Sequence, residues 1–210
     1  MQVYDLSVPI VDGVDWYAEA DCPPVSLRQV GGLNECGWVS HHLSLMVLNG
    51  TTYAETGAHL SADAPTLDQL PPEKLLTRAH VVSLQADGQE LPAPDDLPGF
   101  VPESDAILIH SGWEPHLRLP DYYSASPYFS AALQEWLLQR RPAVLGGDML
   151  PFDHPQDAAM PFLREYFRTG GVIVCPLAGL QPLVGRQVNL CVAPLRLHGA
   201  SGAPCRVLAW

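Results

Sequence analysis

The sequence predicts an α/β protein in which a mixed sheet or small barrel is flanked by helices. Short apolar runs bounded by turn residues recur along the chain, as is typical of buried strands. These runs outnumber the segments with helical periodicity. With 210 residues and a hydrophobic fraction of 47%, the chain is large enough to bury one core, so we expect a single domain over residues 1–210.

The predicted strands are short and spread over the whole chain. The longest, at residues 38–48 (WVSHHLSLMVL), shows a broken alternation of apolar and polar residues, which favours a strand with one buried face. The runs AILIH and AVLGG are apolar enough to be buried on both faces. The full set of predicted strands is 3–6, 38–48, 81–84, 106–110, 143–147, 172–175, 188–194 and 206–210.

Two helices are predicted in the second half of the chain. The first begins after Ser130, a residue type that caps helices. Its apolar face, spaced i, i+3, i+4, consists of Leu133, Trp136 and Leu137. The second runs from about residue 159 to residue 168 and ends at the glycine pair 170–171. Residues 71–77 favour one or two further helical turns, because proline is tolerated in the first turn.

Charge and composition exclude several classes of partner. The formal net charge is −12 and the single lysine is Lys74, so no basic cluster is present that could bind nucleic acid or an anionic membrane. No apolar run is long enough to span a bilayer. The opening MQVYDLSVPI lacks the pattern of a signal peptide, and the five cysteines form no close pair. We therefore expect a cytoplasmic protein with reduced thiols.

The densest polar cluster lies at residues 49–59 (NGTTYAETGAH), directly after an apolar strand. Glu55 and His59 are four residues apart, so one helical turn would place them on one face, within hydrogen-bonding reach. A carboxylate beside an imidazole fixes its tautomer and raises its basicity, as general-base chemistry requires. The alternative is a polar turn in which a backbone carbonyl satisfies His59.

Several stretches together resemble the cyclase family that includes kynurenine formamidases and isatin hydrolases. The opening YDLSVPI resembles the family's D-L-S-x-x-[IL] start, and residues 49–59 fall on its signature H-x-G-T-H-x-D-x-P-x-H. Further similar segments follow in the same order, at 107–113 (ILIHSGW), 144–153 (VLGGDMLPFD), 172–180 (VIVCPLAGL) and 193–209. The resemblance spans nearly the whole chain and implies the family's swivelling β/β/α-like fold.

The resemblance also implies a two-metal site, and here the sequence departs from the family. The five positions that match the family's metal ligands are Asn49, Tyr53, Glu55, Leu163 and Cys175. Leucine cannot bind a metal, and asparagine and neutral tyrosine are poor ligands, whereas zinc and manganese need three or four good donors. We therefore expect no metal cofactor. The alternative is a three-ligand zinc or manganese site at Glu55, His59 and Cys175.

The leading hypothesis is a metal-independent cyclase, isomerase or lyase that acts on a small carbonyl-bearing metabolite. His59 matches the family's acid–base histidine and would shuttle the proton, while Glu55 would orient or share it. Tyr53, with Thr52 or Asn49, would hydrogen-bond the developing oxyanion. Two alternatives stay open: a metal-dependent hydrolase of an amide, formamide or lactam with an altered ligand set, and a non-catalytic binding protein on the same fold.

Four further residues are candidates for substrate binding. Trp16, Tyr17 and Trp113 could form an aromatic slot for a flat or apolar ligand, although aromatic residues serve equally often in the core. His110 ends a predicted strand at the expected edge of the site. The family resemblance implies a homo-oligomer, a dimer or tetramer, in addition to the small-molecule substrate.

Four other polar residues are weighed but are not placed in the predicted catalytic set. Asp148 lies in the segment that matches the family's G-x-D motif, where a hydrogen-bonding role is at least as plausible as a catalytic one. Asp153 and His154 are expected in a solvated loop. Cys175 follows two apolar residues and is expected to be a buried small hydrophobe rather than a nucleophile.

Overall fold

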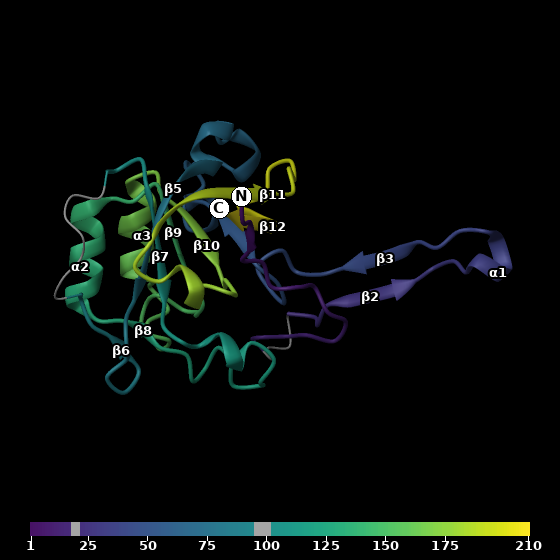
Figure 1. Cartoon of the computed structure of the whole chain (residues 1–210), viewed down its shortest axis with the longest axis horizontal. Helices are drawn as coiled ribbons and strands as arrows, with labels where there is room; N and C mark the ends of the chain where they lie inside the picture. The colour runs from purple at the N-terminus through teal and green to yellow at the C-terminus, as the bar shows by residue number, and fades with distance from the viewer. Residues whose placement is uncertain (18–21, 95–101) are drawn as a thin grey trace.

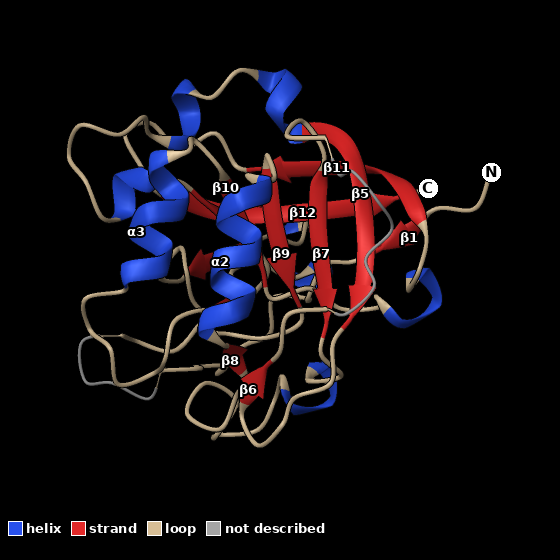
Figure 2. Ribbon diagram, turned by 90° about the vertical axis from the view of Figure 1, so that its left-hand side faces the viewer, coloured by secondary structure: helices blue, strands red, loops and turns tan. Residues whose placement is uncertain are grey.

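The computed structural model describes residues 1–17, 22–94 and 102–210. Its main sheet has the strand order β1-β12-β11-β5-β7-β9-β10-β4, and β4 also pairs with β12, so that seven strands close into a barrel (Figure 2). The strands are β1 (Tyr4–Asp5), β4 (Tyr53–Glu55), β5 (Leu76–Ser83), β7 (Ala106–His110), β9 (Val144–Gly147), β10 (Val172–Cys175), β11 (Gln187–Pro194) and β12 (Gly202–Ala209). The predicted fold class, a mixed sheet or small barrel flanked by helices, is confirmed, and the sheet is a closed barrel.

The remaining elements surround this barrel. Two further sheets have two strands each, β2 with β3 and β6 with β8. These elements are β2 (Ser26–Gln29), α1 (Leu33–Cys36), β3 (His41–Ser44), β6 (Glu90–Leu91), β8 (Tyr128–Phe129), α2 (Ala131–Arg140) and α3 (Pro161–Arg168). Single turns of 3-10 helix lie at Gly57–His59, Leu67–Gln69, Pro72–Leu75, Glu114–His116 and Gln181–Leu183. None of the helices in these described ranges is long and apolar enough to cross a membrane.

The barrel wall separates two apolar cores. β5, β7, β9 and β10 run parallel to one another, and every residue of β7, β9 and β10 is buried. Side chains alternate along each strand, so Leu108 and Val174 pack inside the barrel whereas Ile109 and Ile173 pack outside it. The outer core lies under α2 and α3, which cover one side of the barrel (Figure 2). Strands covered on both faces explain the continuous apolar runs in the sequence.

Both predicted helices are confirmed. The Ser130 hydroxyl accepts a hydrogen bond from the Leu133 amide at 3.3 Å and caps α2. α3 begins at Pro161, two residues later than predicted. It ends shortly before Gly170, whose φ of +80° is the left-handed conformation that glycine adopts after a helix.

The predicted strand at residues 38–48 is wrong in extent and in environment. Only His41–Ser44 forms a strand, β3, and all four of its residues are exposed. β3 pairs with β2, and the two strands project away from the barrel with α1 at the tip (Figure 1). We call residues 26–44 the arm. Because the arm has no core of its own, the alternation in its sequence does not correspond to a buried face.

Candidate active site

A cavity of about 290 Å³ opens outside the barrel beside β4 and β10. The described residues that line it include two groups that exchange protons, Glu55 and His59, but no Lys or Arg. Most of the wall is apolar, from Met46, Leu48, Leu150, Phe152, Met160 and Leu163. A concave apolar pocket with a few polar groups is the usual form of a small-molecule site.

β4 positions two of the polar groups. It is held between β10 and β12, so its side chains alternate between the two cores. Ala54 points into the barrel, whereas Tyr53 and Glu55 line the cavity on the other side. Tyr53 and Glu55 are two residues apart on one strand, so their side chains lie on the same face of β4. This explains why these two positions of the family signature meet at the cavity.

Glu55 is a buried carboxyl group without a compensating partner. The residue is 5% exposed, and its Oε1 atom has no hydrogen-bond partner among the described residues. Burial raises the pKa of Glu55 to about 8 because the charged form loses its hydration. Glu55 is therefore largely a neutral carboxylic acid at neutral pH, able to donate a proton.

His59 lies at the rim of the same cavity. It is the last residue of the 3-10 turn Gly57–His59. The Thr56 side chain, directly before this turn, caps it by accepting a hydrogen bond from the Ala58 amide. The Nδ1 atom of His59 is 3.7 Å from Glu55 Oε1, and the His59 side chain is 37% exposed. This distance is too long for the direct hydrogen bond that the spacing predicted. Burial and the nearby Arg164 cation both lower the pKa of His59, which favours the neutral imidazole.

The Tyr53 hydroxyl group links two other polar side chains of the pocket, Tyr17 and Cys175. It hydrogen-bonds with the hydroxyl of Tyr17 and with the thiol of Cys175. Tyr17 in turn donates a hydrogen bond to the Leu48 carbonyl at 3.1 Å. Burial raises the pKa of all three groups. Cys175 is fully buried and remains a thiol, as expected, rather than a nucleophilic thiolate.

Asn49 and Thr52 do not line the cavity. The Asn49 side chain accepts a hydrogen bond from the Trp16 amide at 3.0 Å and donates one to Asp15 Oδ1 at 2.9 Å. Thr52 Oγ1 accepts a hydrogen bond from the Val8 amide at 2.8 Å. Both side chains fasten the N-terminal segment to the barrel. The predicted oxyanion contact from these two residues is therefore corrected to a structural role.

Of the other predicted substrate-binding residues, only Tyr17 lines the cavity. The buried indole of Trp16 and the partly buried indole of Trp113 donate hydrogen bonds to backbone carbonyls at 2.8 and 3.0 Å. His110 is buried, with its Nδ1 atom 3.3 Å from Ser83 Oγ. These three side chains belong to the core around the site rather than to its wall, because each satisfies its polar atom within the protein.

Two buried aspartates near the site hold backbone segments in place through hydrogen bonds. Asp148 is fully buried and accepts hydrogen bonds from three backbone amides and one hydroxyl within residues 111–113, so its structural role is established. Asp153 was expected in a solvated loop, and this expectation is wrong. It is buried and accepts from the amides of Phe162 and Leu163 at 2.8 and 3.1 Å, at the N-terminal end of α3.

The residues present do not fit a metal ion. Four of the five positions that match the family's ligands, Tyr53, Glu55, Leu163 and Cys175, do meet at this cavity. Leu163 offers no donor atom, and the Cys175 proton is retained. Within the described ranges, no group of three His, Cys, Asp or Glu side chains is arranged to hold a metal. The donors of the pocket therefore suit proton transfer better than metal binding.

The sequence did not reveal most of the apolar wall. Met46, Leu150 and Met160 come from loops, and Met160 has a φ of +46° where the chain enters α3. Leu150 lies in the segment at residues 144–153 that resembles the family's G-x-D motif. No local pattern, however, showed which of its side chains face the cavity, because loop conformation depends on contacts that are distant in sequence.

The closed barrel and the polar groups at its outer edge define an α/β protein with a largely apolar pocket that contains a few polar side chains. A family model described as "Putative cyclase" matches residues 4–154. The chain therefore belongs to the cyclase family. A comparison with curated protein sequences finds no significant match.

Solved structures of similar fold cover almost the entire chain. Isatin hydrolase A from Labrenzia aggregata, bound to benzyl benzoate, has a TM-score of 0.84 and 22% identity over 99% of this chain and 93% of that chain. An isatin hydrolase bound to the product analogue thioisatinate has a TM-score of 0.83 and 18% identity over 99% and 91%. A "predicted metal-dependent hydrolase" from Bacillus stearothermophilus has a TM-score of 0.80 and 18% identity over 99% and 97%. At these identities the comparisons establish the fold.

Proposed function

We propose that this protein catalyses metal-independent proton transfer on a small carbonyl-bearing molecule bound in the Glu55 pocket. The observation on which the proposal depends is the Glu55 carboxyl group, which is buried, faces the pocket and lies beside the imidazole of His59. Its Oε1 atom has no hydrogen-bond partner in the part of the chain that the structure describes. An unpaired buried polar atom is costly unless a ligand or water satisfies it. A carbonyl oxygen bound there would receive a hydrogen bond from the acid.

The two groups have complementary protonation states for an enolisation. Neutral His59 would remove the proton from the carbon beside the carbonyl, while protonated Glu55 would donate its proton to the carbonyl oxygen. Returning the first proton to a different carbon gives an isomer. Expelling a β-hydroxyl group as water gives a dehydration, and attack of the enol carbon on a second carbonyl gives a ring. All three outcomes use the same first step.

The apolar wall and the neutral network around Tyr53 support an uncharged substrate. The described residues that line the pocket provide no cation to pair with a substrate carboxylate, and Glu55 would repel one when ionised. The apolar surroundings would also exclude water, which strengthens the hydrogen bond to the developing enolate oxygen.

Metal-dependent hydrolysis of an amide, formamide or lactam is the second candidate. It is favoured by the fold, which this chain shares with isatin hydrolases and a metal-dependent hydrolase. It requires a ligand set that the pocket does not offer within the described residues. Elemental analysis of protein purified without chelators distinguishes the two candidates, since a stoichiometric transition metal that activity requires would establish the hydrolase.

The direct test is a screen for solvent deuterium incorporation beside the carbonyl of small ketones, 1,3-diketones and β-hydroxyketones, followed by NMR. We expect turnover that His59→Ala and Glu55→Gln abolish while the fold is retained. His198→Ala is a matched control, because His198 is exposed on a loop and does not line the pocket. If both pocket variants exchange protons as fast as the unmodified protein, Glu55 and His59 are not the catalytic pair. If the unmodified protein gives no exchange above the uncatalysed rate, the account is a non-catalytic binding protein.

A further inference from the structure

His59 and Met160 line the Glu55 pocket from two segments that lie outside the strands of the barrel. His59 ends the 3-10 turn Gly57–His59, beyond the end of β4, and Met160 is the residue directly before α3. The hydrogen bonds of the sheet therefore do not fix either side chain. Connecting segments are more mobile than the strands between them, so a separate contact is needed to hold this part of the pocket in one shape.

The Arg164 side chain joins these two segments. Its Nη1 atom donates a hydrogen bond to the carbonyl of Leu60, which follows His59, at 3.0 Å. Its Nε atom donates one to the carbonyl of Ala159, which precedes Met160, at 2.7 Å. Because the guanidinium group is planar and its donors point in fixed directions, it holds the two carbonyls at a set separation.

Met160 has a backbone conformation that needs such support. Its φ of +46° and ψ of 58° lie in the left-handed region, which is uncommon for residues other than glycine. The Arg164 amide donates a hydrogen bond to the Met160 carbonyl at 3.0 Å, so one residue binds the backbone both at Met160 and directly before it. Strained conformations of this kind persist where the surrounding contacts determine them, and they cluster at functional sites.

α3 is a firm base for the Arg164 side chain. Two of its aromatic residues, Phe162 and Phe167, are buried in the outer core. A Cβ atom added at Gly57 would lie 3.1 Å from the Phe167 Cβ atom, so the start of the 3-10 turn is already in close contact with this helix. The Arg164 side chain adds a second attachment just beyond the other end of the same turn.

We propose that Arg164 is a positioning residue for the reaction assigned to the pocket: it binds the backbone beside His59 and beside Met160, and so fixes where these two side chains meet the substrate. Arg164 is not among the described residues that line the pocket, so it acts through these two residues rather than on the substrate itself. The inference rests on the proposed function, because it assumes that His59 takes part in catalysis.

The kinetic test compares variants of Arg164 in the deuterium-exchange assay, on the ketone that the unmodified protein turns over fastest. Arg164→Met keeps an unbranched chain but removes the donors. We expect kcat to fall about tenfold to a hundredfold, because small displacements of a catalytic group are costly, with a much smaller change in KM. Arg164→Lys should recover part of kcat, since its ammonium group can still donate to a carbonyl.

Arg168→Met is the matched control. Arg168 lies one turn further along α3 and pairs with Glu165 at 2.7 Å, on the exposed face of the helix. The substitution removes the same group from the same helix without removing a hydrogen bond to the segments of His59 and Met160. It should leave kcat unchanged.

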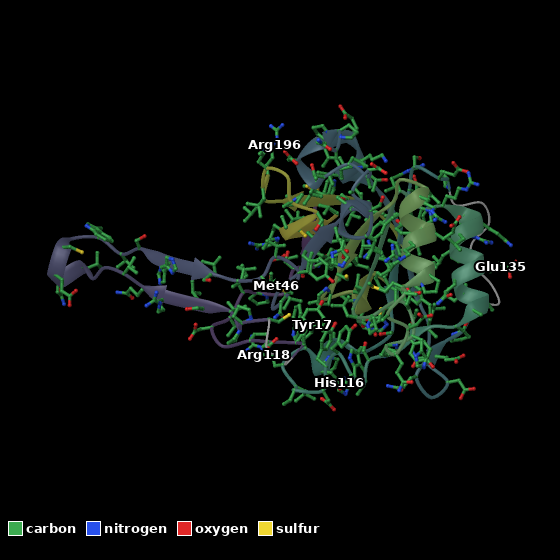
Figure 3. All side chains as sticks on the ribbon, turned by 180° about the vertical axis from the view of Figure 1, so that it is seen from behind. Tyr17, Met46, His116, Arg118, Glu135 and Arg196 are labelled. Atoms are coloured by element: carbon green, nitrogen blue, oxygen red, sulfur yellow. The ribbon has the colours of Figure 1, made fainter. Side chains whose placement is uncertain are left out.

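A second readout needs no substrate. With isotope-labelled methionine methyl groups, the NMR signal of Met160 reports on the segment that Arg164 holds, and it should shift or broaden in Arg164→Met. The signal of Met46 should stay unchanged, because Met46 lines the pocket from a different segment. Figure 3 shows Met46 and Tyr17 where the arm meets the barrel.

The outcomes separate this inference from the proposed function. If the unmodified protein catalyses no exchange, the proposed function is wrong, and the positioning role is wrong with it. If the unmodified protein is active and Arg164→Met keeps its kcat or its Met160 signal, only the positioning role is wrong. An equal loss of kcat in Arg168→Met, with an intact fold by circular dichroism, would also overturn it. Should Arg164→Met not fold, Arg164→Lys must by itself lower kcat and shift the Met160 signal.

Discussion

The Nδ1 atom of His59 lies 3.7 Å from the Oε1 atom of Glu55, at the rim of an apolar cavity. The gap is too long for a hydrogen bond, and Oε1 has no other partner within the described residues. Burial favours the neutral form of both groups, an acid and a base side by side without ionisation. This pairing gives the site its proposed chemistry and leads to the predictions below.

The pH dependence of the reaction should be bell-shaped. The active form has neutral His59 and protonated Glu55. The rate should fall above about pH 8, where Glu55 ionises, and on the acid side at a pKa below the ordinary histidine value of 6.5. Measuring kcat/KM from pH 4 to 10 checks this. A rate that keeps rising through pH 9 would show that the ionised carboxylate is the active form.

The stability of the fold should fall as the pH rises from about 4.5 to about 8. In this window the folded protein retains the Glu55 proton and the unfolded chain has released it, so the folded state binds more protons. The free energy of unfolding should therefore decrease by up to about 1.4 kcal/mol per pH unit from this group.

Glu55→Gln should remove this contribution to the pH dependence of the free energy of unfolding, because the glutamine amide does not titrate. Urea unfolding of both proteins at pH 5 and pH 8 measures the difference. Equal pH dependence in the two proteins would mean that Glu55 is hydrated and ionises normally.

Asn49→Ala should weaken the fold rather than substrate binding. Asn49 is buried and its side chain makes two hydrogen bonds, to the Trp16 amide and to Asp15. Leaving these partners unsatisfied should cost about 1–3 kcal/mol of the free energy of unfolding. The KM of the folded fraction should be unchanged. A large rise in KM without a loss of stability would show that Asn49 contacts the substrate.

Asp148→Ala should be among the most destabilising substitutions near the site. The buried carboxylate holds the turn at residues 111–113 through four donors. Removing it should cost about 3 kcal/mol or more, because three backbone amides and one hydroxyl lose the acceptor that they share. Asp121→Ala, at an exposed position, should change the free energy of unfolding by no more than about 0.5 kcal/mol. Comparable losses in both variants would contradict this structural role.

The elements buried on both faces were the most predictable part of the fold. β7 and β10 match the predicted ranges because continuous apolar runs have one stable environment, a strand covered on both sides. α2 was predictable because its cap and its apolar face are both local in sequence. β12 begins four residues before its predicted start, since Gly202 gave no strand signal but pairs with Glu55.

Part of the candidate site could be predicted from local spacing. The four-residue spacing of Glu55 and His59 predicted that their side chains lie close together, and they are 3.7 Å apart, although Glu55 ends β4 and His59 ends a 3-10 turn rather than sharing one helical turn. The places of Trp16 and Trp113 could not be predicted, because residue type alone does not distinguish an aromatic residue in a pocket wall from one in the core. The strand predicted at residues 38–48 was wrong for a related reason: alternation in the sequence predicts a buried face, but it does not show whether the fold places a core against that face.

The most direct test of the central claim is the rate of proton exchange on an accepted substrate after exhaustive treatment with a chelator. The metal-independent account predicts a full rate in metal-free protein and a loss of about 10²–10⁴-fold in His59→Ala. Loss of the rate on chelation, with recovery on adding zinc or manganese, would contradict it.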